Sequence, residues 1–367
     1  FPDILGFDRP LYYDTPPPPP TSGKLWKVQF DSIDADVRLA WVLEYQLRGT
    51  LKARGSFFLD PNEVATIHPC TVDVRDATIT VGKERIARDV HGLLGTSIDS
   101  FYPPESPIDV VAPKITARIE KFHAYLETLS FLRLYLPPDP LTLEGEGNLD
   151  ADAKMTLGRI DAGSKVALDL KPFTLRSAES HATGQARLAL EGAADGRFET
   201  RVDATFPERK DNAIAVEKLA AMVGFDHDNL TNVEMRRASV DARDVRFTRP
   251  DFFRDAFGKS TAYPVSGALD AQAEIELPRE GEGKVDAKLA TRAMNFYTSG
   301  IQFGMTSEGT LKCHGTRAAG LCALDFHAPY VLFDKQPDPD GKALWLRVRT
   351  TKDARVVVDD GTLVADL

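Results

Sequence analysis

The sequence predicts a mainly β fold: an elongated, antiparallel, twisted sheet that curls into an apolar groove, with two short helices. Three observations support this fold class. Apolar and polar residues alternate over many segments, and Gly, Pro, Asp and Asn separate those segments. The composition, with 43% hydrophobic and 27% charged residues, is that of a core-forming chain. The 367 residues suffice for two or three ordinary domains or for one elongated array.

The clearest alternating segment covers residues 269–277. Its apolar residues are Leu, Ala and Ile, and the residues between them are Asp, Gln or Glu. Since successive side chains of a strand point to opposite faces of a sheet, this segment has one apolar face and one solvated face. The pattern recurs at residues 166–170, 285–289 and 344–348, with turn-forming residues between the segments. This spacing predicts an antiparallel meander.

Two segments show helical spacing instead. Residues 122–136 place apolar side chains three and four positions apart, and two prolines follow. Residues 211–223 begin with Asp and Asn, which are good helix caps, and Gly224 follows as a stop signal. We expect a short helix at each place.

The chain divides into four expected segments. Residues 1–23 contain five consecutive prolines, which predict an extended polyproline II linker. Residues 24–140 form a first β segment that ends in a helix, residues 141–260 form a second β segment, and residues 261–367 form a third. The chain begins with Phe1 rather than Met, so we expect a processed form or a fragment.

The three cysteines predict one disulfide. If Cys313 lies opposite Cys322 in a hairpin, the same register pairs two leucines and two glycines. This coincidence favours a Cys313–Cys322 bond and an oxidising compartment. The alternative is two reduced cysteines packed on an apolar face. Cys70 remains single, and we expect it to be a buried free thiol.

The composition argues against several functions. A formal net charge of −10 and a pI near 5.3 disfavour a nucleic-acid partner, because phosphate contacts require a basic face. The sequence has no phosphate-binding loop, dinucleotide fingerprint, nucleophile elbow or zinc-protease motif. We therefore expect no catalytic residues, no metal and no cofactor. An enzyme with a dispersed site stays open as an alternative.

Three stretches resemble the AsmA-like and TamB-like proteins of Gram-negative envelopes: FLRLYLPP at 131–138, LEGEGNLDADA at 143–153 and GRIDAGSKVAL at 158–168. The start GNLDADA at 147–153 is repeated as GALDAQA at 267–273. The resemblance implies a long, twisted β groove with an apolar interior, a periplasmic location and an N-terminal membrane anchor. It also implies a role in carrying lipids between the inner and outer membranes, with proteins of both membranes as partners at the ends.

The alternating strands supply the expected lining of that groove. Many of its positions are alanines, which leave room for the acyl chains of a phospholipid or a related lipid. The expected lining residues are Leu149, Ala151, Ala153, Val166, Leu168, Leu170, Leu269, Ala271, Ala273, Ile275, Leu277, Val285, Ala287 and Leu289. The alternative is a structural or adhesion-type β protein whose opposing strands fill the apolar face as a sandwich core.

Overall fold

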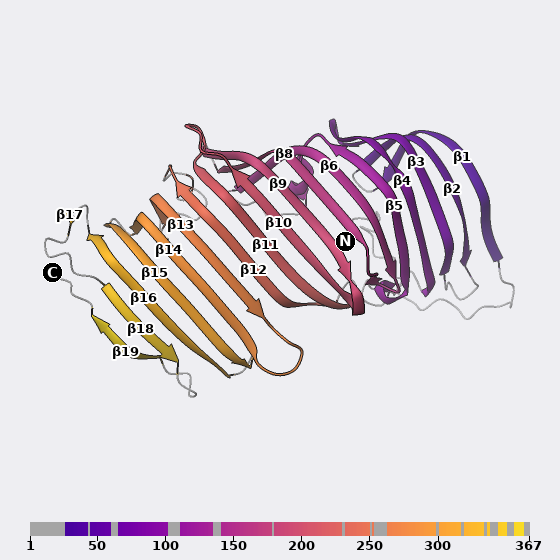
Figure 1. The fold of residues 1–367 in the computed structure, drawn as a ribbon. Coiled ribbons are helices and arrows are strands. Elements are labelled where there is room, and N and C mark those ends of the chain that lie inside the picture. Colours follow the sequence, from indigo (N-terminus) through magenta and orange to yellow (C-terminus); the bar gives the residue numbers. More distant parts are fainter. Residues whose placement is uncertain are drawn as a thin grey trace, which may run out of the picture.

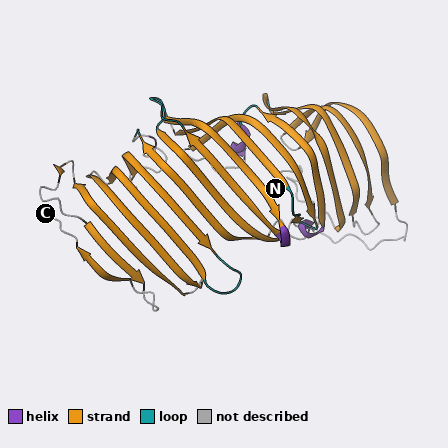
Figure 2. Cartoon of the chain, viewed as in Figure 1, coloured by secondary structure: helices purple, strands orange, loops and turns teal. Residues whose placement is uncertain are grey.

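The computed structural model describes residues 26–42, 45–59, 65–101, 111–134, 141–177, 180–229, 232–249, 252, 263–298, 301–316, 319–333, 336–337, 344–350 and 356–362. Most of these residues lie in strands, and three short 3-10 helices connect some of them (Figures 1 and 2). The strands are β1 (Trp26–Val42), β2 (Tyr45–Leu59), β3 (Ala65–Val81), β4 (Glu84–Phe101), β5 (Ile115–Leu126), β6 (Leu141–Thr156), β7 (Arg159–Ile160), β8 (Lys165–Ser177), β9 (Ser180–Ala193), β10 (Arg197–Phe206), β11 (Ile214–Asn229), β12 (Asn232–Phe247), β13 (Tyr263–Glu276), β14 (Gly283–Thr298), β15 (Ile301–Thr316), β16 (Ala319–Phe333), β17 (Gln336–Pro337), β18 (Leu344–Thr350) and β19 (Val356–Thr362). The 3-10 helices are η3 (Ala112–Lys114), η4 (Ser130–Leu134) and η5 (Ala194–Gly196).

The 19 strands form one sheet, and each long strand pairs with its neighbours in the sequence. All strand pairs are antiparallel, so the chain runs as a meander from β1 to β19. Two short strands, β7 and β17, pair with β6 and β16 at the sheet's margins. Figure 1 shows β1 and β19 at opposite ends of an open, twisted sheet. The predicted mainly β, antiparallel fold is confirmed. The expected segment boundaries near residues 140 and 260 fall in the connections β5–β6 and β12–β13.

β-Bulges bend many of these strands. In β5 the register shifts between Ile119 and Phe122, and the intervening Lys121 has a φ of 48°. In β11 two residues stand opposite one residue of β10, between Leu219 and Val216. An extra residue in one strand locally increases its twist and bends it. The bulges therefore contribute to the arched shape that the strands have in Figure 1.

Both helix predictions are wrong, and a bulge explains the one at residues 211–223. Residues 214–223 of that segment form the beginning and middle of β11, and residues 122–126 end β5. Side chains on one face of a strand normally recur every second residue, and a bulge inserts one extra residue. Two apolar residues on the same face then lie three positions apart in the sequence, as Val216 and Leu219 do. That spacing imitates a helix. The only helical part of the predicted 122–136 segment among its described residues is η4.

The sequence repeat has a structural counterpart in two glycines. Gly147 in β6 and Gly267 in β13 each lie where the neighbouring strand passes very close. A Cβ at Gly147 would collide with the carbonyl oxygen of Asp169, and one at Gly267 would meet Ala293 and Met294. Gly267 also has a φ of 106°, which glycine adopts readily. The repeat therefore marks comparable register shifts inside two strands.

The disulfide prediction is confirmed. Cys313 in β15 and Cys322 in β16 are bonded, with their Cα atoms 4.0 Å apart. The register that pairs them also pairs Leu311 with Leu324, and Gly315 with Gly320, as expected. Cys70 is a free cysteine, but it is half-buried rather than buried. No helix in the described residues is long and apolar enough to cross a membrane.

Candidate functional site

One face of the sheet, here called the inner face, is apolar along most of its length. Residues that pair directly across antiparallel strands lie on the same face, so the register follows this face from strand to strand. One row of mutually paired residues runs from β5 to β16. Its members are Ala124, Leu149, Leu168, Leu188, Val202, Ala221, Val240, Ala273, Ala287, Leu311 and Leu324.

The register places the predicted lining residues on this inner face, except Leu277. They form two groups. In β6 and β8, Leu149 pairs with Leu168 and Ala151 with Val166. In β13 and β14, three pairs join the strands: Ala271 with Leu289, Ala273 with Ala287, and Ile275 with Val285. Ala153, Leu170 and Leu269 lie on the same face of these strands. Leu277 follows the end of β13, where its backbone N–H donates to the carbonyl of Arg236 (2.6 Å).

Four strands, β9 to β12, connect the two groups, and their inner residues were missed by the sequence analysis. Leu188 of β9 pairs with Leu168 on one side and with Val202 on the other. Val240 of β12 pairs with Ala221 and Ala273. In β9, small and polar residues alternate, and this pattern could have identified the strand and its inner residues from the sequence. In β11 the bulge concealed the same signal.

The inner face is covered in one part and exposed in another. Over β2 to β8, here called the covered section, Leu170 is only 2% exposed and belongs to a cluster with Val90, Ala124 and Leu129. Over β9 to β15, here called the open section, Leu188 is 39%, Val240 38% and Leu289 43% exposed. One end of this section is buried, where Phe206 and Val216 form a second cluster with Phe252 of the β12–β13 connection. Large exposed apolar residues in adjacent rows of one face indicate a binding surface more than a core.

Aromatic side chains border the inner face of the open section toward both ends of its strands. Near the β9–β10 connection, the rings of Phe198 and Phe225 stack with centroids 5.0 Å apart. Toward the opposite ends of the strands, the ring centroids of Phe206 and Phe173 are 6.1 Å apart. Between these pairs the rows consist mainly of Ala, Val and Leu. The small side chains make a shallow track between two aromatic borders.

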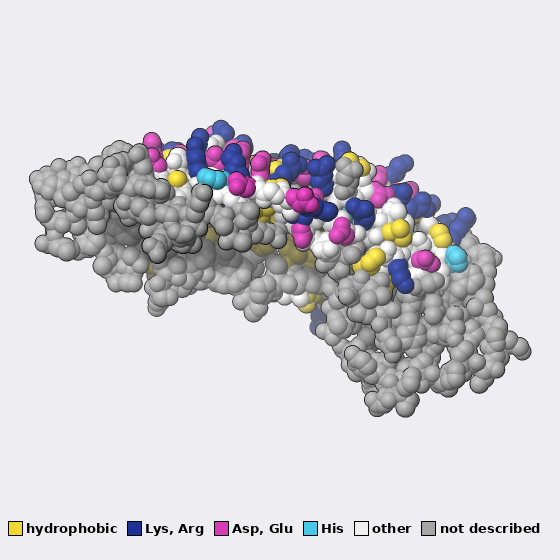
Figure 3. Space-filling view, turned by 90° about the horizontal axis from the view of Figure 1, so that it is seen from below, with side chains coloured by type: hydrophobic (Ala, Val, Ile, Leu, Met, Phe, Trp, Pro, Cys, Tyr) yellow, Lys and Arg dark blue, Asp and Glu magenta, His cyan; other side chains and the backbone are white. Residues whose placement is uncertain are grey.

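The opposite, outer face carries cross-strand ion pairs. Asp241 accepts hydrogen bonds from Arg243 (3.0 Å) and Lys218 (2.6 Å), and these hold the pKa of Asp241 well below its ordinary value. Asp244 binds Arg246 and Arg292, each at 2.8 Å, and the hydrogen bond from Arg246 lowers its pKa. In Figure 3, charged side chains crowd the upper edge of the molecule, and hydrophobic ones are visible in the hollow beneath. The two faces therefore differ sharply in polarity.

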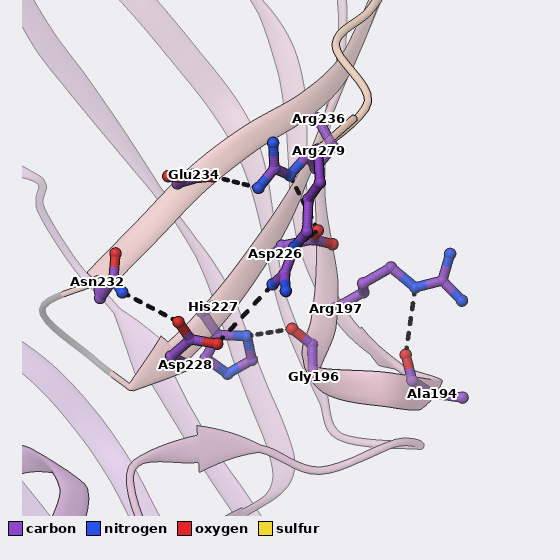
Figure 4. A network of polar contacts seen from close by, with 10 residues as sticks. All are labelled: Ala194, Gly196, Arg197, Asp226, His227, Asp228, Asn232, Glu234, Arg236 and Arg279. Carbon is purple, nitrogen blue, oxygen red and sulfur yellow. Dashed lines mark hydrogen bonds and ion pairs between the residues drawn. The ribbon is translucent and has the colours of Figure 1, made fainter. Parts of the chain in front are cut away.

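A polar network joins the β11–β12 and β13–β14 ends (Figure 4). Asp226 binds both Arg236 (2.9 Å) and Arg279 (3.0 Å), and Arg279 also reaches Asp228 at 3.8 Å. Arg236 additionally pairs with Glu234. Each charge in this network thus has an opposite partner within the protein, which is the arrangement of a structural clamp.

His227 is buried at the centre of the network. Its Nδ1 lies 2.7 Å from the carbonyl oxygen of Gly196, and its Nε2 accepts the N–H of Ile160 at 2.6 Å. A carbonyl can only accept, so Nδ1 carries the proton and the ring is neutral. Both nitrogens are occupied, so His227 connects β11 to η5 and β7 rather than presenting a base or metal ligand.

The described residues contain no group of three or more His, Cys, Asp or Glu side chains that could hold a metal ion. The exposed apolar residues of the open section remain as the candidate binding surface. Comparison with family models, curated proteins and solved structures finds no match for this chain.

Proposed function

We propose that the chain binds the acyl chains of lipids on the inner face of its open section, without catalysing a reaction. The observation that carries this proposal is the exposure of three large apolar side chains on that face: Leu188 and Val240 in one row, and Leu289 in the row beside it. Each buried methylene of a ligand contributes about 0.8 kcal/mol, so a long acyl chain on such a row would bind favourably. A carboxylate or phosphate could remain in water at the margin of the sheet.

The shape of the inner face supports a linear ligand. The rows run across the strands, and neighbouring strands lie about 4.8 Å apart. An extended chain lying along a row would contact one side chain from each successive strand. The alanines at positions 221, 273 and 287 leave depth for it. This argument extends the expected apolar groove to strands that the sequence analysis did not assign.

A filled sandwich is the main alternative, and the strand pairing disfavours it. A sandwich core needs a second sheet packed about 10 Å away, whereas the described strands all belong to one sheet. We propose further that the lipid is carried between the membranes of a Gram-negative envelope, with the chain in the periplasm and anchored to a membrane. This rests on the sequence resemblance. The Cys313–Cys322 disulfide is compatible with such an oxidising compartment.

The test is to purify the protein from cells rich in phospholipid, extract it with organic solvent and analyse the extract by mass spectrometry. We expect phospholipid or fatty acid in a reproducible ratio to protein. An unrelated β protein of the same net charge, purified in parallel, controls for carry-over. An extract with no more lipid than this control would refute the proposal.

A further inference from the structure

The connection between β5 and β6 lies against the inner face. Its residues 127–134, here called the β5–β6 segment, include η4. Leu129 is 3% exposed and belongs to the buried cluster of the covered section, and Phe131 and Leu132 pack against that cluster. A Cβ at Gly145 would lie 3.5 Å from the Cδ1 atom of Leu129, which places this side chain over β6.

Polar contacts hold the beginning of the segment. The N–H of Glu127 donates to the carbonyl of Ile86 at 2.9 Å. The carboxylate of Glu127 binds Arg85 at 2.6 Å and Arg88 at 3.2 Å. These contacts fix the point at which the chain leaves β5. The β5–β6 segment is therefore anchored to the sheet at Glu127, and its later residues would pivot about that point.

Beyond Glu127, the hydrogen bonds of the turn are internal. Leu132 N–H donates to Leu129 O at 3.0 Å, and Arg133 Nε donates to Ser130 O at 3.0 Å. The turn can therefore move as a unit without losing them. Its apolar side chains, with an ion pair from Arg133 to Glu84 at 4.0 Å, attach it to the sheet.

We infer that the β5–β6 segment is a displaceable plug that occupies the inner face of the covered section in place of an acyl chain. This inference rests on the proposed function. Leu129, Phe131 and Leu132 cover the apolar surface that a lipid would otherwise cover. An acyl chain would replace the contacts that these side chains make with the sheet, so displacement costs only the exposure of Leu129, Phe131 and Leu132 themselves. Lipid would then occupy the open section first and reach β4 only after the segment lifts.

The experiment uses two photoreactive reporter positions on the full chain. Benzoylphenylalanine replaces either Leu94, on β4 in the covered section, or Val240, on β12 in the open section. The protein is incubated with vesicles of phosphatidylethanolamine and phosphatidylglycerol that contain a radiolabelled phosphatidylethanolamine, and then irradiated. Crosslinked lipid per protein is measured for each reporter, with the original segment and with variants of it.

The variant Leu132→Asp weakens the attachment of the plug, because a carboxylate would have to lie on an apolar surface. We expect it to raise lipid crosslinking at position 94 several-fold and to leave position 240 unchanged. Leu134→Asp is the matched control, since Leu134 lies in the same turn but is 52% exposed. It should change neither reporter. Leu132→Ala, which introduces no charge, should give a smaller increase at position 94 if Leu132→Asp fails to fold.

Equal crosslinking at position 94 with the original segment and with folded Leu132 variants would overturn the plug. The proposed function fails in a different way. In that case position 240 would not be labelled with any form of the segment.

Discussion

The covered and open sections of the sheet have the same alternating sequence pattern but different surroundings. In the covered section, Leu170 and Ala124 lie beneath Leu129 of the β5–β6 segment and are almost fully buried. In the open section, Leu188 and Val240 belong to the same row of paired residues and remain more than a third exposed. Alternation therefore specifies which side chains share a face. Whether that face is a core depends on a few residues from a connection.

The two sections also differ in what stabilises them. The covered section has a compact apolar cluster on its inner face. The open section has a second apolar cluster around Phe206 and Phe252 at one end of its strands, and on its outer face Asp241 and Asp244 bridge β11, β12 and β14 through ion pairs. At its far end the disulfide joins β15 to β16. Where the inner face around Leu188 and Val240 stays exposed, ion pairs and the disulfide contribute stability in place of a core.

The largest expected effect is that of a charge placed in the covered section. Leu170→Asp would bury a carboxylate in the cluster, and we expect it to lower the free energy of unfolding by about 3 kcal/mol or more. Leu289→Asp in the open section should cost less than about 1 kcal/mol, because Leu289 is 43% exposed. Urea unfolding measures both. Equal losses would mean that the two sections do not differ as described.

Removing the disulfide should have an intermediate effect. The Cys313→Ser, Cys322→Ser double variant opens a short loop, and we expect a loss of about 2–3 kcal/mol in the chain-entropy model. Hydrogen exchange should increase in β15 and β16 and stay unchanged in the covered section. Without reductant, alkylation of the denatured wild-type protein should label only Cys70. Exchange that increases uniformly across the sheet would argue against a local role.

The smallest expected effect concerns acid. The pKa values of Asp241 and Asp244 are lowered in the folded protein by hydrogen bonds from Arg243 and Arg246, respectively, below an ordinary value of 3.8. Their stabilising contribution is therefore complete above that value and is lost as the pH falls below it. Urea midpoints should agree at pH 7 and 5 and fall at pH 3. Asp241→Asn should make that fall smaller; an unchanged pH profile would show that the ion pair contributes nothing.

The sequence analysis predicted the antiparallel meander, the shared face and the register of the cysteine hairpin, because these depend on local alternation. It failed where bulges change the period. Val216 and Leu219 were assigned to a helix, yet they lie on one face of β11 on either side of a bulge. It also could not assign Leu129 a role as cover, since that depends on how the β5–β6 connection folds back over the sheet.

The most direct test of the account compares two adjacent residues of β9 that lie on opposite faces. Leu188 is on the exposed inner row, whereas Ala189 is on the outer face, opposite Arg201. Lipid bound per folded protein is counted by native mass spectrometry after purification from membranes. We predict that Leu188→Asp loses most of the lipid and that Ala189→Asp retains it, with both proteins folded by circular dichroism. Equal lipid content in the two folded variants would contradict a lipid-binding inner face.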